Sequence, residues 1–210
     1  MKAFSHVVAA LAIAGAAGPP PAGPQAAARA AVVLDNERVR AYRTMADVVD
    51  GVDHGGGVVI WLRDGAGGKA GRAIWRDDAA APPAQGMGRE EVVIVQPRGA
   101  PMPPANAPPS GSKPGEAVFT GMSFVPLFDN ARAAVIRARM DVDAREGFHT
   151  HASDTIVVHL SGGEIEDTAN GKTIVNRWQP GDVEFEGRGS SHSARNIGRP
   201  VDVVLVALKP

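Results

Sequence analysis

The 210-residue chain contains no cysteine, and its aromatic residues are few: one tyrosine, three tryptophans and six phenylalanines. Without cysteine there is no disulfide framework, no thiolate metal ligand and no cysteine nucleophile, so any bound metal must take nitrogen and oxygen ligands. An excess of charge is also lacking, because 22 basic residues face 23 acidic ones and the net charge is −1. This balance gives no electrostatic reason to expect a nucleic-acid partner.

Long hydrophobic runs are missing apart from one near the N-terminus. Lys2 precedes an apolar run over residues 7–17, which is followed by small residues and a stretch rich in proline and alanine. The run is shorter than the roughly 20 residues that a hydrocarbon core requires, so we expect no stable membrane anchor. The layout is typical of a bacterial secretory signal, with cleavage after Ala16 or after Ala30. We therefore expect residues 1–30 to be a signal peptide with a Pro/Ala-rich segment, and the mature protein to be periplasmic or secreted.

A segment rich in proline, glycine and alanine divides the remaining chain. It covers residues 99–115, and its closely spaced prolines exclude a helix or an inner strand. We interpret it as a linker or a long surface loop. It separates a shorter unit, residues 31–98, from a longer one, residues 116–210.

The two units resemble each other weakly. Residues 33–38 are similar to residues 127–132, and residues 58–62 are similar to residues 156–160. The similarity predicts an internal duplication in which the first copy is shortened. A unit that small buries too little surface for comfortable stability alone, so we expect it to pack against the second copy.

Strand signals dominate both units. Segments rich in β-branched or alternating residues are separated by clusters of Gly, Asp, Asn and Pro, which predicts an all-β sandwich or barrel. In the second unit the predicted strands are residues 133–140, 155–160, 173–177, 182–186 and 201–208. One short helix is expected, over residues 43–49.

Three histidines form the strongest candidate site. His149 and His151 stand at positions i and i+2, and in an extended segment such residues project from the same face. His192 follows a turn-rich segment, residues 187–191, that lies between two strand-like runs. The three imidazoles together predict a metal site.

The pattern around His149 and His151 resembles the first motif of the cupin superfamily. The fold of that family is a double-stranded β-helix, or jelly-roll barrel, whose two motifs line one metal site. The first motif reads G-x5-H-x-H-x3,4-E-x6-G. Here Asp143 stands in the place of the first glycine, and the two histidines are followed by Gly162 or Gly163.

The second cupin motif, G-x5-P-x-G-x2-H-x3-N, is matched more closely. Gly181, Gly189, His192 and Asn196 fall at the expected spacing, and Gly187 replaces the proline. The resemblance covers residues 120–210 well and implies a cupin-like jelly-roll barrel there. The first unit would then be a degenerate cupin-like copy.

The metal ligands depart from the family pattern. The glutamate ligand of the first motif would fall at Thr155 or Ile156, and neither side chain is a carboxylate. Asp154 lies next to them, but strand alternation points it to the opposite face unless a bulge intervenes. The resemblance therefore implies a site of three histidines, completed by water or substrate. Such a site can hold one divalent transition metal, and iron, manganese, nickel, copper and zinc all accept imidazole ligands.

The candidates for the surrounding pocket or for support behind the ligands are Asp154, Thr155, His159, Asn196, Arg137 and Arg139. Thr155 and His159 share the parity of His149 on an extended strand, and His159 is interpreted as a pocket-lining or buried, satisfied histidine rather than a fourth ligand. Asn196 is interpreted as holding a turn through backbone hydrogen bonds.

Two pairs of charged residues each allow two interpretations of their role. Arg137 and Arg139 form either a solvated face or, if that face lies inside, a site for a substrate carboxylate. Glu184 and Glu186 alternate with apolar neighbours, which favours a solvent-exposed role over a catalytic one.

The leading functional hypothesis is an exported metal-binding cupin that acts on a small molecule, most plausibly as a dioxygenase-type oxidoreductase. Three-histidine centres occur among cupins that resemble thiol dioxygenases, so the missing glutamate does not exclude redox chemistry. One alternative is a non-catalytic module that binds a ligand or a metal. Another is a cupin-type isomerase, which would require an acid or base such as His159 or Glu184 in the pocket. A homodimer paired through edge strands is also compatible with the pattern.

Overall fold

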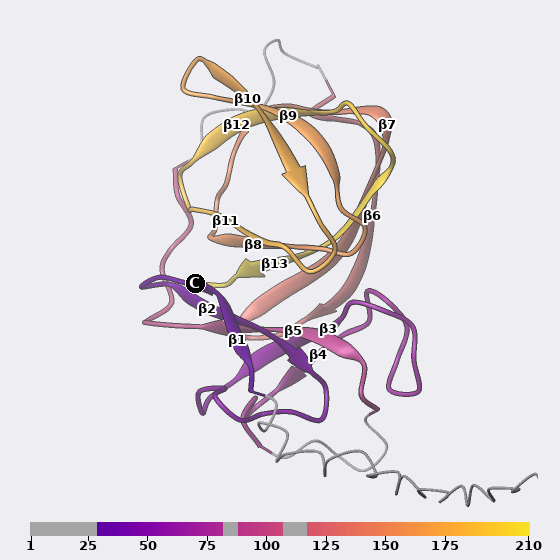
Figure 1. Ribbon diagram of the computed structural model, residues 1–210. Helices are drawn as coiled ribbons and strands as arrows, with labels where there is room; N and C mark the ends of the chain where they lie inside the picture. The colour runs from indigo at the N-terminus through magenta and orange to yellow at the C-terminus, as the bar shows by residue number, and fades with distance from the viewer. Residues whose placement is uncertain (1–28, 82–87, 107–116) are drawn as a thin grey trace, which may run out of the picture.

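The computed structural model describes residues 29–81, 88–106 and 117–210, and these residues form thirteen β-strands and no helix (Figure 1). The predicted all-β class is confirmed. Residues 1–28 of the predicted signal segment and residues 107–115 of the predicted linker lie outside the described residues. Within the described ranges, no helix is long and apolar enough to cross a membrane.

The first part of the chain forms an open antiparallel sheet of five strands. Their order is β1 (Ala31–Asp35), β2 (Val39–Met45), β5 (Glu91–Pro97), β3 (Gly57–Trp61) and β4 (Ala73–Arg76). The predicted short helix over residues 43–49 is wrong, because Arg43 to Met45 continue β2 and pair with Val93 to Glu91 of β5. Pairing with a neighbouring strand has overridden the local preference of this segment.

The second part forms an eight-stranded antiparallel sheet that curls into a barrel (Figure 1). Its strands are β6 (Phe119–Asp129), β7 (Ala133–Thr150), β8 (Thr155–His159), β9 (Gly163–Ala169), β10 (Lys172–Trp178), β11 (Val183–Glu186), β12 (Ser191–Asn196) and β13 (Val201–Leu208). The order is β10-β9-β12-β7-β13-β8-β11, and β6 pairs with the other edge of β7. All five predicted strands of this part are present. The strand that begins at Ala133 runs on to Thr150 and so carries His149.

The two sheets share one hydrophobic core. Figure 1 shows the indigo-to-magenta sheet lying against one side of the barrel, next to β8 and β13. Buried side chains from both sheets meet there, among them Val39, Ile60 and Val93 from the first sheet and Val135, Ile156, Val158, Val204 and Val206 from the barrel. Burying a side chain of this size stabilises the fold by about 1.5–3 kcal/mol. The outer face of the barrel is therefore apolar where these side chains pack.

The first unit is a sheet and not a second closed barrel. Its strands β3 and β5 are buried on both faces, since Val59, Trp61 and Ile94 pack into a separate cluster on the side away from the barrel. A two-barrel architecture is therefore not confirmed. The duplication and the unit boundaries at residues 31–98 and 116–210 stay predictions.

Left-handed backbone conformations occur at the motif positions that determine the chain path. Asp143, which stands where the first cupin motif has glycine, has a φ of 63°. Aspartate is one of the few residues that tolerate this region, and its carboxylate accepts a hydrogen bond from Arg195 Nη2 at 2.6 Å. Gly181 has a φ of 90° and Gly189 a φ of 84°, so the spacing of the second motif places glycine where the backbone needs it.

Candidate metal centre

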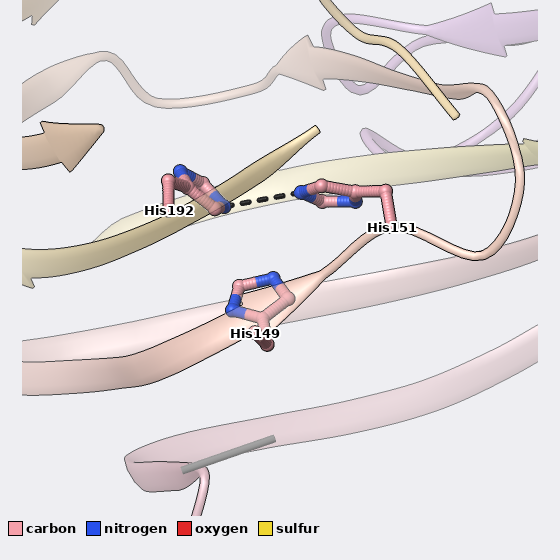
Figure 2. A group of neighbouring side chains, drawn as sticks. All are labelled: His149, His151 and His192. Atoms are coloured by element: carbon pink, nitrogen blue, oxygen red, sulfur yellow. Dashed lines mark hydrogen bonds between the residues drawn. The ribbon is translucent and has the colours of Figure 1, made fainter. Parts of the chain in front are cut away.

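The three histidines lie together inside one end of the barrel (Figure 2). One nitrogen of each imidazole lies within 4.8 Å of the corresponding nitrogens of the other two. His149 lies near the end of β7, and His151 follows directly after that strand. His192 lies on β12 and is the register partner of His149, so the pairing of β7 with β12 brings the two motifs side by side. The predicted grouping of the three side chains is what the structure shows.

Hydrogen bonds determine which ring nitrogens are free to bind a metal. His149 Nδ1 lies 3.0 Å from the carbonyl oxygen of Gly147, and His192 Nδ1 lies 3.0 Å from Asp167 Oδ1. A carbonyl oxygen and a carboxylate both accept, so in each imidazole Nδ1 carries the proton and Nε2 keeps its lone pair. Asp167 thus orients a candidate ligand in the way carboxylates behind metal-bound histidines commonly do.

The donor set fits a transition metal. His151 Nε2 lies 3.1 Å from His192 Nε2, as the dashed line in Figure 2 shows. Two nitrogens that bind one metal at about 2.0–2.1 Å, roughly at right angles, are separated by about 3 Å. The same spacing would bring two lone pairs together if neither nitrogen carried a proton, and a cation between them removes that repulsion. Three imidazoles are ligands that iron, manganese, nickel, copper and zinc accept.

Two glutamates that the sequence did not indicate as site residues lie against the histidines. Glu186 Oε2 is 3.6 Å from His151 Nδ1, and Glu186 Oε1 is 3.9 Å from His192 Nε2. Glu146 Oε2 is 3.7 Å from His192 Nε2. Both glutamate side chains are less than a fifth exposed. Thr155 stands at the position where the motif has glutamate. Glu146 of β7 and Glu186 of β11 instead place carboxyl groups near the histidines.

The surroundings shift the protonation of this cluster. Burial, together with the neighbouring carboxyl groups of Glu184, Glu146 and Asp167, raises the pKa of Glu186 to about 9. Burial also raises the pKa of Glu146, while the His192 charge opposes this. Burial, together with His192 and His149, lowers the pKa of His151 to about 4. At neutral pH the metal-free site therefore contains a neutral His151 and a protonated Glu186.

The raised pKa of Glu186 predicts an alkaline loss of stability in the metal-free protein. Its pKa is about 9 when folded and about 4.5 when unfolded, so unfolding between these values releases a proton and stability falls as pH rises. Glu186→Gln cannot titrate, so between pH 7 and pH 9 we expect it to lose less stability than the wild type, by on the order of 1 kcal/mol. Urea unfolding of chelator-treated protein at both pH values measures this difference. Glu164→Gln, at an exposed position, is the control and should follow the wild type; equal pH slopes in all three proteins would contradict the prediction.

A cavity of about 300 Å³ extends from the histidines into the barrel. This volume is at the lower end of the range for small-molecule sites. Its wall is mainly apolar. The polar side chains are those near the histidines, His159 itself, and Glu184 and Asn176. The arrangement suits a small, largely apolar molecule with a polar group directed at the histidines.

The candidate pocket residues on β8 lie where strand alternation predicts, whereas Asp154 lies on the side away from the cavity. Thr155 and His159 both line the cavity. Asp154 faces the opposite way, where Arg38 Nε donates to Oδ2 at 2.8 Å and the Arg188 backbone N–H donates to Oδ1 at 2.8 Å. No bulge brings Asp154 to the metal centre, so its place as a pocket candidate is corrected.

Asn196 lies outside the cavity lining and is fully buried. Its side-chain amide donates to the backbone oxygens of Asp141 and Arg199, each at 2.9 Å, and its Oδ1 accepts from Gly198 N–H at 3.1 Å. Asn196 thus fixes the backbone of the adjacent turn, as predicted, and it does not line the cavity.

The arginine candidates face away from the cavity. Arg137 makes a two-pronged ion pair with Asp202, at 2.9 and 2.5 Å, and also donates to the backbone oxygen of Ala70 in the first unit. Arg139 pairs with Asp141 near the surface. A role for either arginine in binding a substrate carboxylate inside the barrel is therefore corrected.

The expectation of an exposed face for Glu184 and Glu186 is also wrong. Both side chains line the cavity, and their neighbours Val183 and Phe185 pack outward on the shared core. Alternation was present as predicted, but the first sheet covers the outside of β11 and makes that side apolar. The polar side of this strand is consequently the inner one.

Comparisons with known proteins add a likeness in fold. No protein-family model matches the chain, and no curated protein matches it. Among solved structures, it is similar to a cupin domain from Bordetella pertussis Tohama I, with 21% identity over 43% of this chain and 95% of that chain and a TM-score of 0.41. It is also similar to the polyketide cyclase RemF from Streptomyces resistomycificus, with 17% identity over 46% of this chain and 70% of that chain and a TM-score of 0.40. A predicted oxalate decarboxylase from Thermotoga maritima is similar with 24% identity over 44% of this chain and 84% of that chain and a TM-score of 0.37.

The fold itself rests on the strand order and on where the two motifs lie. The first motif ends β7, the second runs from the start of β11 into β12, and the register of β7 with β12 joins their histidines within one antiparallel barrel. The jelly-roll fold that the two motifs predicted is confirmed, and residues 119–208 form a barrel of the cupin type.

Proposed function

We propose that this protein is a metal-dependent enzyme that acts on a small, largely apolar molecule, with dioxygenase-type oxidation as its chemistry. The observation that carries the proposal is the meeting of three imidazole donors at the polar end of an apolar cavity of about 300 Å³. A bound transition metal with three protein ligands offers open positions and charge stabilisation to a substrate and to dioxygen. The apolar wall keeps water from the reacting groups and strengthens electrostatic interactions there.

Metal content is the first test of this proposal. Protein made without a metal-affinity tag should contain about one equivalent of iron, manganese, nickel, copper or zinc by elemental mass spectrometry. We do not rank these metals, because the ligand set alone does not choose among them. Absence of metal, even after reconstitution with each of the five ions, would overturn the proposal.

A second candidate function is a proton-transfer reaction such as an isomerisation. Glu186 favours it, because a buried carboxyl group whose pKa is raised to about 9 can donate a proton at neutral pH. Glu186 lies against the same histidines, so a substrate held there would be within its reach. A non-catalytic role would give no chemical function to the buried carboxyl groups of Glu186 and Glu146.

One pair of measurements separates the candidates. The metal-loaded protein is incubated with a panel of small diketones, flavonols and thiols while oxygen consumption is followed. The same panel is then incubated without oxygen in deuterated water, and deuterium incorporation is followed by NMR. Oxygen consumption supports the oxidative function and anaerobic exchange the isomerase, whereas binding without either result indicates a binding module.

Export and self-association are separate parts of the proposal. We propose that the N-terminal pattern directs the protein to the periplasm or the medium, which cell fractionation and N-terminal sequencing of the mature chain can test. We propose that the protein forms a homodimer through the exposed edge of the barrel, where Ile174 and Val175 of β10 are 45% and 39% exposed. Light scattering of the mature protein tests it.

A further inference from the structure

The end of the cavity away from the metal centre contains one buried polar ring, His159. Its side chain is 3% exposed and lines the cavity. Among the residues that the structure describes, neither of its ring nitrogens has a hydrogen-bond partner. The carboxylate nearest to it is Glu184, whose Oε2 is 3.9 Å from Nε2 and thus beyond hydrogen-bond distance.

Strand register separates His159 from the metal centre. Glu186, which contacts the histidines, pairs with Thr155, and Glu184 pairs with Val157 one step further along β8. His159 lies beyond both, four residues past Thr155, or about 13 Å of strand at roughly 3.3 Å per residue. Between the two ends most of the lining is apolar, with Met122, Phe124, Ile136, Met140, Val157 and Leu205 among its side chains, and Glu184 adds one carboxyl group.

The ring of His159 is held in a fixed orientation. It stacks on Trp178 with the ring centroids 4.6 Å apart and the planes at 17°. The backbone of His159 is also fixed, since its N–H donates to Asp182 and its carbonyl accepts from Gly181. The side chain is therefore pre-positioned, with its edge directed at the cavity and not at a protein partner.

Such an arrangement costs stability. A buried polar group without a partner is unfavourable, and an apolar ring would fill this position better. Residues that break local rules in this way are concentrated where function requires them. The observation therefore calls for a ligand atom that completes the hydrogen bond.

We propose that His159 is a second recognition point, which hydrogen-bonds a hydroxyl or carbonyl group at the far end of the substrate. The substrate would be an elongated, planar molecule with an apolar middle, one oxygen group at the three histidines and another at His159. This inference rests on the proposed function for the identity of the ligand as a substrate. The binding contact at His159 requires no metal, and this makes it testable separately.

The test compares two probes that differ in one hydroxyl group, 2-naphthol and 2,6-dihydroxynaphthalene, on metal-free full-length protein. Binding is followed by quenching of tryptophan fluorescence and confirmed by calorimetry. We expect the second hydroxyl to lower the Kd about tenfold in the wild type, the size expected of a hydrogen bond to a buried group that is otherwise unpaired. His159→Phe keeps the stack on Trp178 and should abolish the preference, whereas His159→Gln, which can still form a hydrogen bond, should keep part of it.

Stability provides the second readout. Because His159→Phe removes an unpaired buried polar group, we expect the ligand-free variant to be at least as stable as the wild type, which a purely structural histidine would not allow. His54→Phe, at an exposed position in the first unit, is the matched control and should leave the tenfold preference intact. An equal preference in His159→Phe, no preference in the wild type, or no binding of either probe would overturn the inference. Metal content and turnover do not enter this experiment, so failure of the proposed function would be seen independently.

Discussion

His192→Ala should abolish stoichiometric metal binding while the barrel stays folded. The side chain supplies one of only three imidazole donors, and its Nε2 lies 3.1 Å from the corresponding nitrogen of His151. Changes behind a metal ligand typically lower affinity by about 10- to 100-fold, and removal of the ligand itself should exceed that range. Elemental analysis and metal titration measure the loss, and circular dichroism checks the fold.

Two further variants make this result specific. Asp167→Asn leaves all three imidazoles but weakens the acceptor behind His192, so we expect the smaller, about 10- to 100-fold loss. His54→Ala removes a histidine whose side chain is 86% exposed and should leave the metal content unchanged. Unchanged metal content in His192→Ala would disprove the proposed centre.

Asp154→Ala should be among the most destabilising substitutions in the chain without affecting metal binding. The carboxylate is 7% exposed and joins Arg38 of the first unit to the backbone of Arg188 in the barrel. Removing it leaves the guanidinium of Arg38, which is 16% exposed, without this ion pair and with a hydrogen bond to the backbone oxygen of Ala100. Breaking one side of a buried ion pair costs about 3–5 kcal/mol. Urea unfolding of the metal-free protein measures the loss.

The ion pair of Asp129 with Lys209 offers a matched comparison. Asp129 is 66% exposed, so Asp129→Ala should cost no more than about 1 kcal/mol. Replacing both partners of the buried pair, as in Arg38→Met with Asp154→Ala, should restore part of the stability lost in the single variant. A loss below about 1 kcal/mol in Asp154→Ala, or a loss of bound metal, would contradict the role assigned to this residue.

Alternation along single strands predicted much of the site. The parity of residues 155, 157 and 159 describes which side chains of β8 face the cavity, because that strand is extended and regular. The same parity placed Asp154 on the opposite side. Motif spacing then indicated that His192 belongs with the pair on β7, and the structure brings them together.

The positions of Glu186 and Glu146 beside the histidines could not be predicted from the sequence. Parity on β11 is evident in the sequence, but it does not say which face is inside, and alternation with apolar neighbours alone favours an exposed Glu186. The covering of β11 by a sheet from residues far away in the chain reverses that assignment. Glu146 lies between motif positions and has no pattern of its own, so only the pairing of β7 with β12 could reveal its place beside His192.

The covering of the barrel by the first sheet has a consequence for how the protein can be divided. A chain that began at residue 116 would expose to water the side of the barrel that carries Val135, Ile156, Val158, Val204 and Val206. A contiguous apolar surface of that kind promotes aggregation. The barrel and the sheet beside it therefore depend on each other for solubility, and we expect the smallest soluble form of the protein to retain both.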